Sequence, residues 1–373
     1  MSGNRPLHAA NRAKQDEFYT QLSDIENELK HYRDHFRGKT VYCNCDDPRV
    51  SNFFHYFSFN FAHLGLKKLV TTCYQNQERD LFSRHDRKRA IKLEYDGYRE
   101  GERVPNADDI GVSLLRGDGD FRSQECIEIL KEADIVVTNP PFSLFREYVA
   151  QLVEHGKRFL VIGSMNAITY REIFPLIRDG RLWLGLGPAG RDMLFDVPEA
   201  YARELVDTKK EGSAYRMVDG VVKGRLGNAA WFTNLDHAKR REKLRLWRRY
   251  TPEEYPTYDN YDAINVKRTA EIPMDYDGVM GVPITFLDKH NPDQFEIVGV
   301  SYLWDEGLSS HTFYDDYVEM RPDGARTGMT GRKANGLAVL KGRPPNPSGY
   351  YLARGEDVVH TVYKRVFIKR IGA

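Results

Sequence analysis

A short apolar run ends in a tetrapeptide that could hold and methylate a planar amine. Residues 135–137 are β-branched, as in a strand buried within a parallel sheet, and the chain then reads Asn139-Pro140-Pro141-Phe142 after one threonine. Neither proline has a backbone N–H, so the strand must stop at Asn139. The Asn139 side-chain oxygen and the Pro140 carbonyl could accept hydrogen bonds from an exocyclic NH2 group, while Phe142 could stack on the ring that carries it.

This arrangement suits the chemistry of an aromatic amine, whose lone pair is delocalised into its ring. Two acceptors placed outside the ring plane favour a pyramidal nitrogen that can attack a methyl sulfonium. Such a site works by positioning and by stabilising the positive charge that develops on nitrogen, so it needs no strong base. The alternative interpretation is a strand that ends in a proline turn without any chemistry.

Composition sets the outer limits. The chain has 373 residues, is 41% hydrophobic and contains no apolar run near the length of a membrane span, which predicts a soluble protein of two domains without a membrane partner. No apolar signal segment begins the sequence, and the four cysteines fit a reducing cytoplasm. Cys43 and Cys45 could form half of a metal site, but no Cys-x-x-Cys or close pair of histidines completes it, so we expect buried thiols and no metal.

The charge is balanced overall but concentrated locally. The net charge is +1, yet residues 237–249 are strongly basic, and residues 84–89 and 364–370 repeat this on a smaller scale. Each run alone could be a solvated surface. Together with a base-methylating motif, they favour contacts with phosphates of a nucleic acid.

The elements that must position the motif alternate between strands and helices. An amphipathic helix is expected over residues 22–36, and seven strands follow, near residues 39–44, 67–72, 112–115, 135–138, 158–163, 182–186 and 229–234. Strands joined by helical crossovers predict a doubly wound, Rossmann-like α/β domain over residues 1–240. Short strands with frequent Pro, Gly, Tyr and Asp predict a smaller α+β or mostly β domain over residues 241–373.

These motifs carry a resemblance to the EcoRI-type adenine-specific DNA methyltransferases, which use S-adenosylmethionine. The resemblance covers most of the chain, and its motifs occur in the expected order: residues 16–20, 41–48, 116–121, 139–142, 227–235 and 281–289. It implies that the first domain is a methyltransferase domain with Asn139, Pro140, Pro141 and Phe142 as the catalytic residues. The second domain would recognise the DNA target.

The resemblance also implies which residues bind the cofactor. They are Phe18, Tyr19, Thr20, Asn44, Asp46, Asp47, Pro48, Asp118, Asp120 and Phe121. Asp118 or Asp120 could accept a hydrogen bond from the amine of the cofactor adenine. Residues 117–120 also fit a simple Asx-type turn. The sequence departs from related methyltransferases in two places, since the turn after the first strand lacks glycine and no carboxylate follows the second strand to bind the ribose.

The substrate implied by the resemblance is double-stranded DNA, from which the target adenine must be flipped out. Candidate reading residues in the second domain are Arg326, Arg332, Lys333, Asn335, Lys341 and Arg343, in a glycine-rich segment that could equally be a solvated loop. We expect a cytoplasmic monomer. It is either a restriction-modification enzyme whose cognate restriction endonuclease acts as a separate protein, or an orphan or phage modification enzyme. The alternatives are methylation of RNA adenine N6 or of a protein glutamine on the same catalytic fold, and a non-catalytic DNA-binding protein.

Overall fold

The computed structural model describes residues 19–45, 47–49, 51–74, 90–97, 110–187, 191–197, 199–302 and 308–372. The chain forms two compact units, the first from Met1–Ala167 with Leu182–His237 and the second from Ile168–Arg181 with Ala238–Ala373. The sequence predicts one boundary at residues 240/241, whereas these units divide at residues 237/238 and place Ile168–Arg181 with the second unit. No helix in the described part of the chain has the length and apolar character needed to cross a bilayer.

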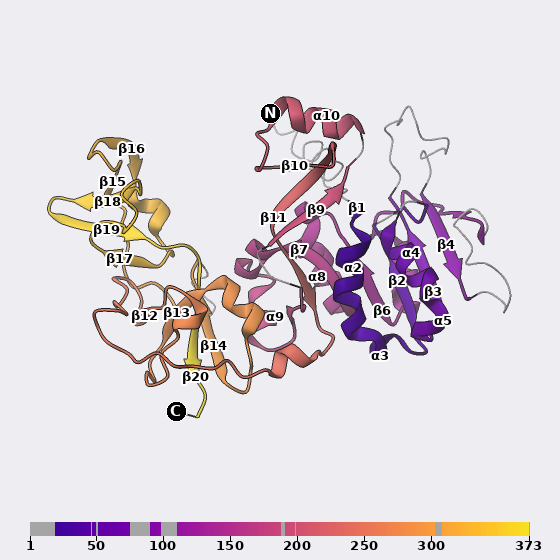
Figure 1. Cartoon of the computed structure of the whole chain (residues 1–373), viewed down its shortest axis with the longest axis horizontal. Coiled ribbons are helices and arrows are strands. Elements are labelled where there is room, and N and C mark those ends of the chain that lie inside the picture. Colours follow the sequence, from indigo (N-terminus) through magenta and orange to yellow (C-terminus); the bar gives the residue numbers. More distant parts are fainter. Residues whose placement is uncertain are drawn as a thin grey trace. The chain divides into compact units, whose positions relative to one another are not determined.

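The first unit is built on an eleven-stranded sheet in the order β1-β9-β11-β7-β6-β2-β3-β4-β5, with β8 and β10 also paired to β11 (Figure 1). Its strands are β1 (Tyr19–Thr20), β2 (Thr40–Cys43), β3 (Lys68–Thr72), β4 (Ile91–Tyr95), β5 (Ser113–Leu114), β6 (Ile135–Thr138), β7 (Arg158–Ser164), β8 (Trp183–Leu184), β9 (Arg191–Asp196), β10 (Tyr215–Val218) and β11 (Val221–Thr233).

The centre of this sheet is parallel, and its strand order reverses there. Strands β3, β2, β6 and β7 lie side by side in parallel pairs. The chain passes from β2 to β3 on one side, and later from β6 to β7 on the other. A topological switch point therefore lies between β2 and β6, and ligands of open α/β sheets bind at the carboxyl ends of the strands at such a point.

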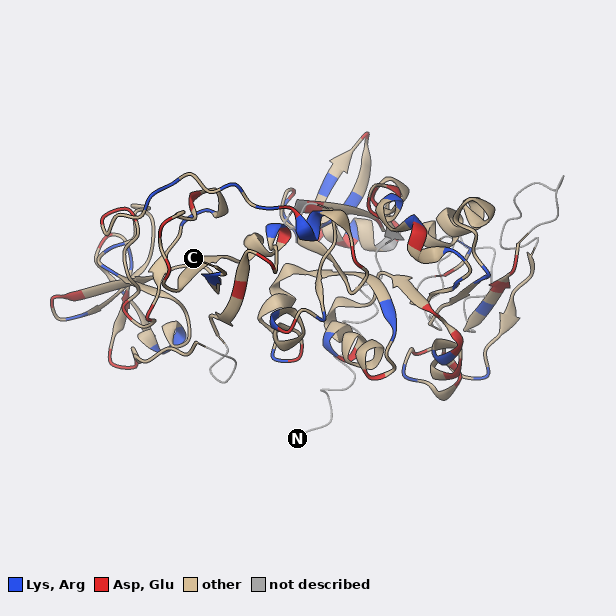
Figure 2. Cartoon of the chain, turned by 90° about the horizontal axis from the view of Figure 1, so that it is seen from below, with Lys and Arg blue, Asp and Glu red and all other residues tan. Residues whose placement is uncertain are grey.

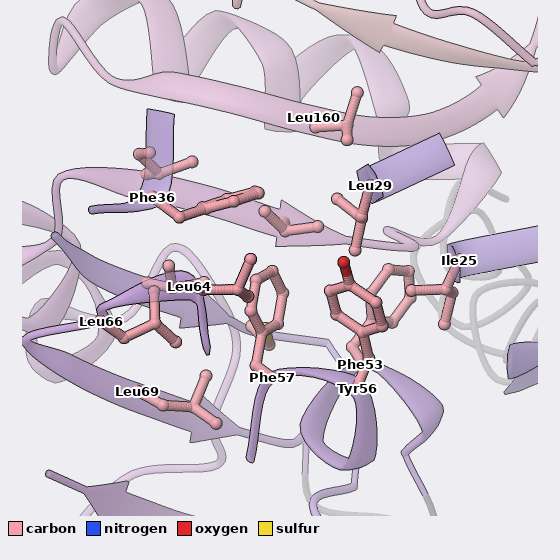
Figure 3. Packing of buried hydrophobic residues seen from close by; sticks show 14 of the residues in the cluster. Ile25, Leu29, Phe36, Phe53, Tyr56, Phe57, Leu64, Leu66, Leu69 and Leu160 are labelled. Atoms are coloured by element: carbon pink, nitrogen blue, oxygen red, sulfur yellow. The ribbon is translucent and has the colours of Figure 1, made fainter. Parts of the chain in front are cut away.

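Helices cover both faces of the sheet. They are α2 (Leu22–Leu29), α3 (Arg33–Phe36), α4 (Asn52–Phe59), α5 (Phe61–Leu64), α7 (Gln124–Glu132), α8 (Phe145–Glu154) and α10 (Glu199–Thr208), with 3-10 turns η1 (Lys30–Tyr32), η2 (Phe142–Leu144) and η3 (Met165–Thr169). Apolar residues of α2 and α4 pack together in one core cluster (Figure 3). The same cluster contains Val41 of β2 and Ile135 of β6. On the opposite face Phe145 of α8 packs on Phe232 of β11, with ring centroids 5.1 Å apart.

A mixed α/β unit with a large central sheet is thus confirmed, with local corrections. Residues 112–115 contain only β5, an exposed antiparallel strand of two residues at the sheet edge. Residues 182–186 likewise contain only the two-residue β8. The expected strand at residues 229–234 is the end of β11, which has 13 residues.

The second unit is mostly β and contains two sheets. A four-stranded sheet has the order β12-β13-β20-β14, and a five-stranded sheet has the order β16-β15-β18-β19-β17. The elements are α9 (Phe174–Arg178), η4 (Ala238–Arg241), β12 (Ile264–Asn265), η5 (Thr269–Glu271), β13 (Met280–Pro283), η6 (Ile284–Lys289), β14 (Phe295–Val300), β15 (Val318–Met320), β16 (Arg326–Thr330), η7 (Gly331–Ala334), β17 (Val339–Lys341), β18 (Tyr351–Arg354), β19 (Asp357–Thr361) and β20 (Arg365–Arg370).

Candidate functional site

The Asn-Pro-Pro-Phe turn lies where the sequence predicts it, directly after the fully buried β6. Asn139 is 9% exposed, and the Pro141 carbonyl accepts from the Leu144 amide at 3.0 Å, which starts η2. The Pro140 carbonyl accepts no hydrogen bond from the residues that the structure describes. Phe142 is half-buried and packs against the core cluster beneath α4. The turn therefore brings an amide, a carbonyl and an aromatic ring together at one point.

Asn44, at the carboxyl end of β2, is held beside this turn. Its backbone carbonyl accepts a hydrogen bond from the Thr138 hydroxyl, and its Oδ1 accepts one from the Tyr148 hydroxyl of α8. Asn44 is 3% exposed. Burial raises the pKa of Tyr148 well above its ordinary value, so this phenol stays protonated and donates. The structure thus brings Asn44 and Asn139 together across the switch point.

The turn after β2 compensates for its missing glycine. Cys45 has a φ of 67°, the left-handed backbone conformation that glycine adopts most readily. The carboxylate of Asp47 binds Arg49 through two side-chain hydrogen bonds, at 3.0 Å to Nε and 2.9 Å to Nη2. Asp47 is therefore engaged within its own turn. Pro48 is buried, and Asp46 lies outside the described residues.

The two aspartates after β5 differ in their partners. The Asp120 carboxylate binds the Arg122 side chain at 2.9 Å and 2.7 Å. Burial alone would raise the pKa of Asp120. The hydrogen bonds from Arg122 and its positive charge outweigh burial, so the pKa of Asp120 is lowered overall. Asp118 is exposed, and its Oδ1 accepts a hydrogen bond from the Asp120 amide at 3.0 Å, as in the Asx-type turn that was the alternative interpretation.

This loop rests against the end of β3. Gly119 has a φ of 77°, and a Cβ placed on it would lie 2.2 Å from the carbonyl oxygen of Cys73. Phe121 is 5% exposed and meets the Tyr148 ring edge-on, with centroids 5.0 Å apart. The loop therefore reaches from the end of β3 to α8, along the same edge of the sheet as Asn44.

The N-terminal group of predicted cofactor residues is described only in part. Phe18 lies outside the described residues, and the backbone of Tyr19 pairs with Asp196 of β9. Thr20 is 2% exposed, and its Oγ1 has no hydrogen-bond partner within the described structure. Its carbonyl accepts from the Asn52 side chain at 2.7 Å, at the start of α4. Thr20 thus lies beside the helix that follows the β2 turn.

Sequence reasoning missed Thr138, Tyr148 and Cys45 as parts of this site. Tyr148 stands in the apolar stripe that predicts α8, and its hydroxyl is the one signal that such a position needs a polar partner. Thr138 was expected only as a residue of the strand. The positive φ of Cys45 could not be predicted, because such a backbone conformation at a cysteine leaves no signature in the sequence. The ribose partner stays unassigned, and no group of three His, Cys, Asp or Glu residues in the described ranges could hold a metal ion.

Several basic residues of the second unit pair with carboxylates, and charges of both signs are interspersed along the chain (Figure 2). In the run 237–249, Lys239, Arg241 and Arg249 lie 2.6, 3.2 and 3.6 Å from aspartate oxygens. The run 84–89 lies outside the described residues, and Arg370 of the third run is 3.6 Å from Asp277. These pairs reduce the charge that the runs can offer to phosphates.

The candidate base-reading residues fall into two groups. Lys333 pairs with the buried Glu319, Asn335 accepts from the Tyr314 amide at 2.8 Å, and Arg343 stacks on Tyr351. These three are used within the fold. The others are exposed, although Arg332 lies 3.6 Å from Asp315 and Lys341 lies 3.8 Å from Asp259. Together with Arg326 they belong to the segment that forms β16, η7 and β17.

Comparison with known proteins identifies sequence relatives over most of the chain. The family model described as adenine-specific methyltransferase EcoRI matches residues 6–370. The chain is 51% identical over 297 residues to the type II methyltransferase M.EcoRI of Escherichia coli, covering 79% of this chain and 89% of the relative. It is 40% identical over 298 residues to the type II methyltransferase M.MpnI of Mycoplasma pneumoniae, covering 78% and 84% respectively. No solved structure shows significant similarity.

Proposed function

The chain belongs to the EcoRI family of adenine-specific methyltransferases, and we propose that it transfers a methyl group from S-adenosylmethionine to the N6 amine of a flipped-out adenine in a specific sequence of duplex DNA. It is thus a type II, site-specific DNA adenine methyltransferase of a restriction-modification system. The observation that carries the proposal is the junction of Asn44 and Asn139 at the switch point of the sheet.

At this junction, the turn that begins with Asn139 is suited to bind the acceptor amine. The Asn139 Oδ1 and the Pro140 carbonyl accept from the N6 amine and stabilise the positive charge that grows on it. Pro141 fixes the turn through its restricted φ, and Phe142 stacks on the flipped base. When bound, S-adenosylmethionine supplies an electrophilic methyl sulfonium. The protein contributes position and electrostatics rather than a strong base.

The donor side fits S-adenosylmethionine in three respects. Asp118 offers an exposed carboxylate to an adenine amine, while Asp120 and Asp47 are occupied by arginines. Phe121 follows in the same loop and supplies an aromatic ring that packs against Tyr148. The buried Thr20 hydroxyl lacks a partner within the described structure and can bind the polar methionine end. We assign Asp118 to the cofactor adenine and leave Asp46 and Phe18 as expectations from the family.

Asp118→Asn is expected to weaken cofactor binding about ten-fold, because hydrogen bonds to charged groups contribute about 1.5–3 kcal/mol. The amide can still accept from the Asp120 N–H and keep the turn, but it presents a donor instead of the second carboxylate oxygen. Titration calorimetry with S-adenosylmethionine measures the change. Glu132→Gln, which removes an exposed charge at the end of α7, is the control and is expected to leave the affinity unchanged.

Phe142→Ala is expected to reduce kcat/KM for DNA by about 5- to 150-fold, because base–aromatic stacking contributes about 1–3 kcal/mol. Cofactor affinity is expected to stay near that of the wild type. Steady-state kinetics with an oligonucleotide substrate and a parallel cofactor titration separate the two effects. Equal losses in both would show that Phe142 serves the core cluster and not the flipped base.

For the second unit we propose recognition of the DNA target. Its exposed Arg326, Arg332 and Lys341, in the segment that forms β16, η7 and β17, support this role because arginine and lysine contact both phosphates and guanine edges. We further propose that the protein is a monomer, acts in the cytoplasm, and is accompanied by a separate restriction endonuclease. The specific bases read by these side chains remain unassigned.

Modified-base sequencing tests the function directly. A methylation-deficient bacterial host expressing the wild type is expected to carry N6-methyladenine in a single sequence context, while the same host expressing Asn139→Ala carries none. Absence of the modification from both hosts, while the purified wild type binds S-adenosylmethionine, would instead indicate RNA or protein glutamine as the substrate. It would also contradict the role assigned to the second unit.

A further inference from the structure

We propose that the Tyr148 hydroxyl is a positioning group that fixes Asn44, on the cofactor side, relative to the catalytic Asn139. The inference rests on the function proposed above, because that function assigns Asn44 to the cofactor and Asn139 to the target amine. Tyr148 itself touches neither reactant in this scheme. It acts through Asn44.

The first support is that one segment of the chain, from Thr138 to Tyr148, donates two hydrogen bonds to Asn44. Tyr148 belongs to α8 and is 0% exposed, and its hydroxyl donates to the Asn44 side chain. Thr138, the last residue of β6, donates to the Asn44 carbonyl. Asn139 lies between these two donors along the chain. The segment that carries the catalytic amide therefore sets the position of the residue that ends β2.

The second support is that the same helix holds the loop at the adenine side. The Tyr148 ring meets the Phe121 ring at an interplanar angle of 73°, and the Gln151 side chain donates to the Phe121 carbonyl at 3.1 Å. One turn of α8 thus contacts both proposed cofactor segments. A shift of this turn relative to β2 changes the site as a whole.

The consequence follows from the geometry that methyl transfer demands. The acceptor nitrogen and the methyl carbon must meet in line, and a misplacement of about 1 Å can cost about 100-fold in rate. Without the hydroxyl, the buried Asn44 Oδ1 loses its donor, and an unsatisfied buried acceptor is costly enough for the side chain to reorient. Cofactor binding must then restore the productive orientation before methyl transfer.

Tyr148→Phe tests this role because it removes the hydroxyl and keeps the ring against Phe121. We expect about ten-fold weaker S-adenosylmethionine binding, from the loss of one buried donor. We also expect about a ten-fold lower kcat at saturating cofactor, from misalignment. Calorimetry and single-turnover methylation of duplex DNA measure the two quantities.

Tyr261→Phe is the matched control. Tyr261 is 2% exposed in the second unit, and its hydroxyl donates to the Gly336 carbonyl at 2.7 Å. This variant loses a comparable buried hydrogen bond and is expected to lower Tm without changing the affinity for the cofactor. If Tyr148→Phe lowers Tm in the same way and leaves both affinity and kcat within about two-fold of the wild type, the positioning role is wrong.

A double-mutant cycle with Asn44→Ala tests whether Tyr148 acts through Asn44. We expect the effect of Tyr148→Phe on affinity to vanish in the Asn44→Ala background, because the acceptor of its hydroxyl is gone. Additive losses would overturn the proposal. A wild type that fails to bind S-adenosylmethionine is a different result, since it overturns the proposed cofactor site itself and the role of Tyr148 with it.

Discussion

Asn139→Ala is expected to lower kcat by about 10²- to 10³-fold, the loss typical of removing one preorganised group that stabilises transition-state charge. The side chain extends from the end of a fully buried strand, so truncation removes its oxygen without moving the backbone of the turn. The amine then keeps the Pro140 carbonyl as an acceptor and loses the second one. Single-turnover methylation of duplex DNA at saturating cofactor measures this loss.

Cofactor affinity separates catalysis from folding in this experiment. The residues proposed to bind the methyl donor belong to other segments of the chain. The affinity of Asn139→Ala for S-adenosylmethionine is therefore expected to lie within about two-fold of that of the wild type. Asn139→Asp keeps an acceptor oxygen and is expected to lose less activity than the alanine variant. Asn60→Ala is the control for loss of an amide elsewhere, because the Asn60 side chain donates to the Tyr56 carbonyl at 2.8 Å. Near-normal turnover by Asn139→Ala would contradict the catalytic assignment.

The parallel centre of the sheet could be predicted because its strands are short apolar runs. Ile135 and Val137 point into the cluster beneath α4, while Val136 is buried on the opposite face, and burial on both faces selects β-branched residues throughout. The helix α8 was equally clear from its apolar stripe. Local hydrophobic pattern thus sufficed for these buried elements.

The antiparallel extension of the sheet could not be predicted in the same way. Strands β9 to β11 carry charged residues that pair across strands, such as Arg225 and Arg216 with Asp192, at 2.7 and 2.8 Å. Apart from the apolar end of β11, which the sequence does predict, these polar strands show no apolar alternation. Nor could periodicity assign Ile168–Arg181 to the second unit, because that assignment depends on contacts distant in sequence.

Within the site, the sequence predicted which segments meet but not which carboxylates are available. Asp47 and Asp120 each bind the arginine two residues later, Arg49 and Arg122. In these two turns the Asp-x-Arg spacing therefore places the carboxylate against an arginine of its own turn. Asp118 lacks an arginine at that spacing, and this difference supports its assignment to the cofactor.

Gly119→Ala is expected to weaken S-adenosylmethionine binding by at least about 30-fold. The left-handed conformation costs an L-residue about 1–2 kcal/mol, and overpacking costs about 1–3 kcal/mol more. Gly119 has a φ of 77°, and its new Cβ would lie 2.2 Å from the Cys73 carbonyl oxygen and 2.8 Å from the Ala90 Cβ. The overlap is with backbone, so no side chain can rotate away. The loop that carries Asp118 and Phe121 must move off the end of β3.

Two other glycines separate the causes of this loss. Gly111 has a φ of 84° with nothing within 4 Å of its Cβ position, so Gly111→Ala carries the backbone cost without the overlap. Gly117 has neither a positive φ nor a close neighbour, and Gly117→Ala sets the baseline within the same loop. The affinity for S-adenosylmethionine, measured by calorimetry, should be highest for Gly117→Ala, lower for Gly111→Ala and lowest for Gly119→Ala. If Gly119→Ala binds the cofactor as tightly as Gly111→Ala, contact between the loop and β3 does not shape the site, and the adenine of the cofactor binds elsewhere.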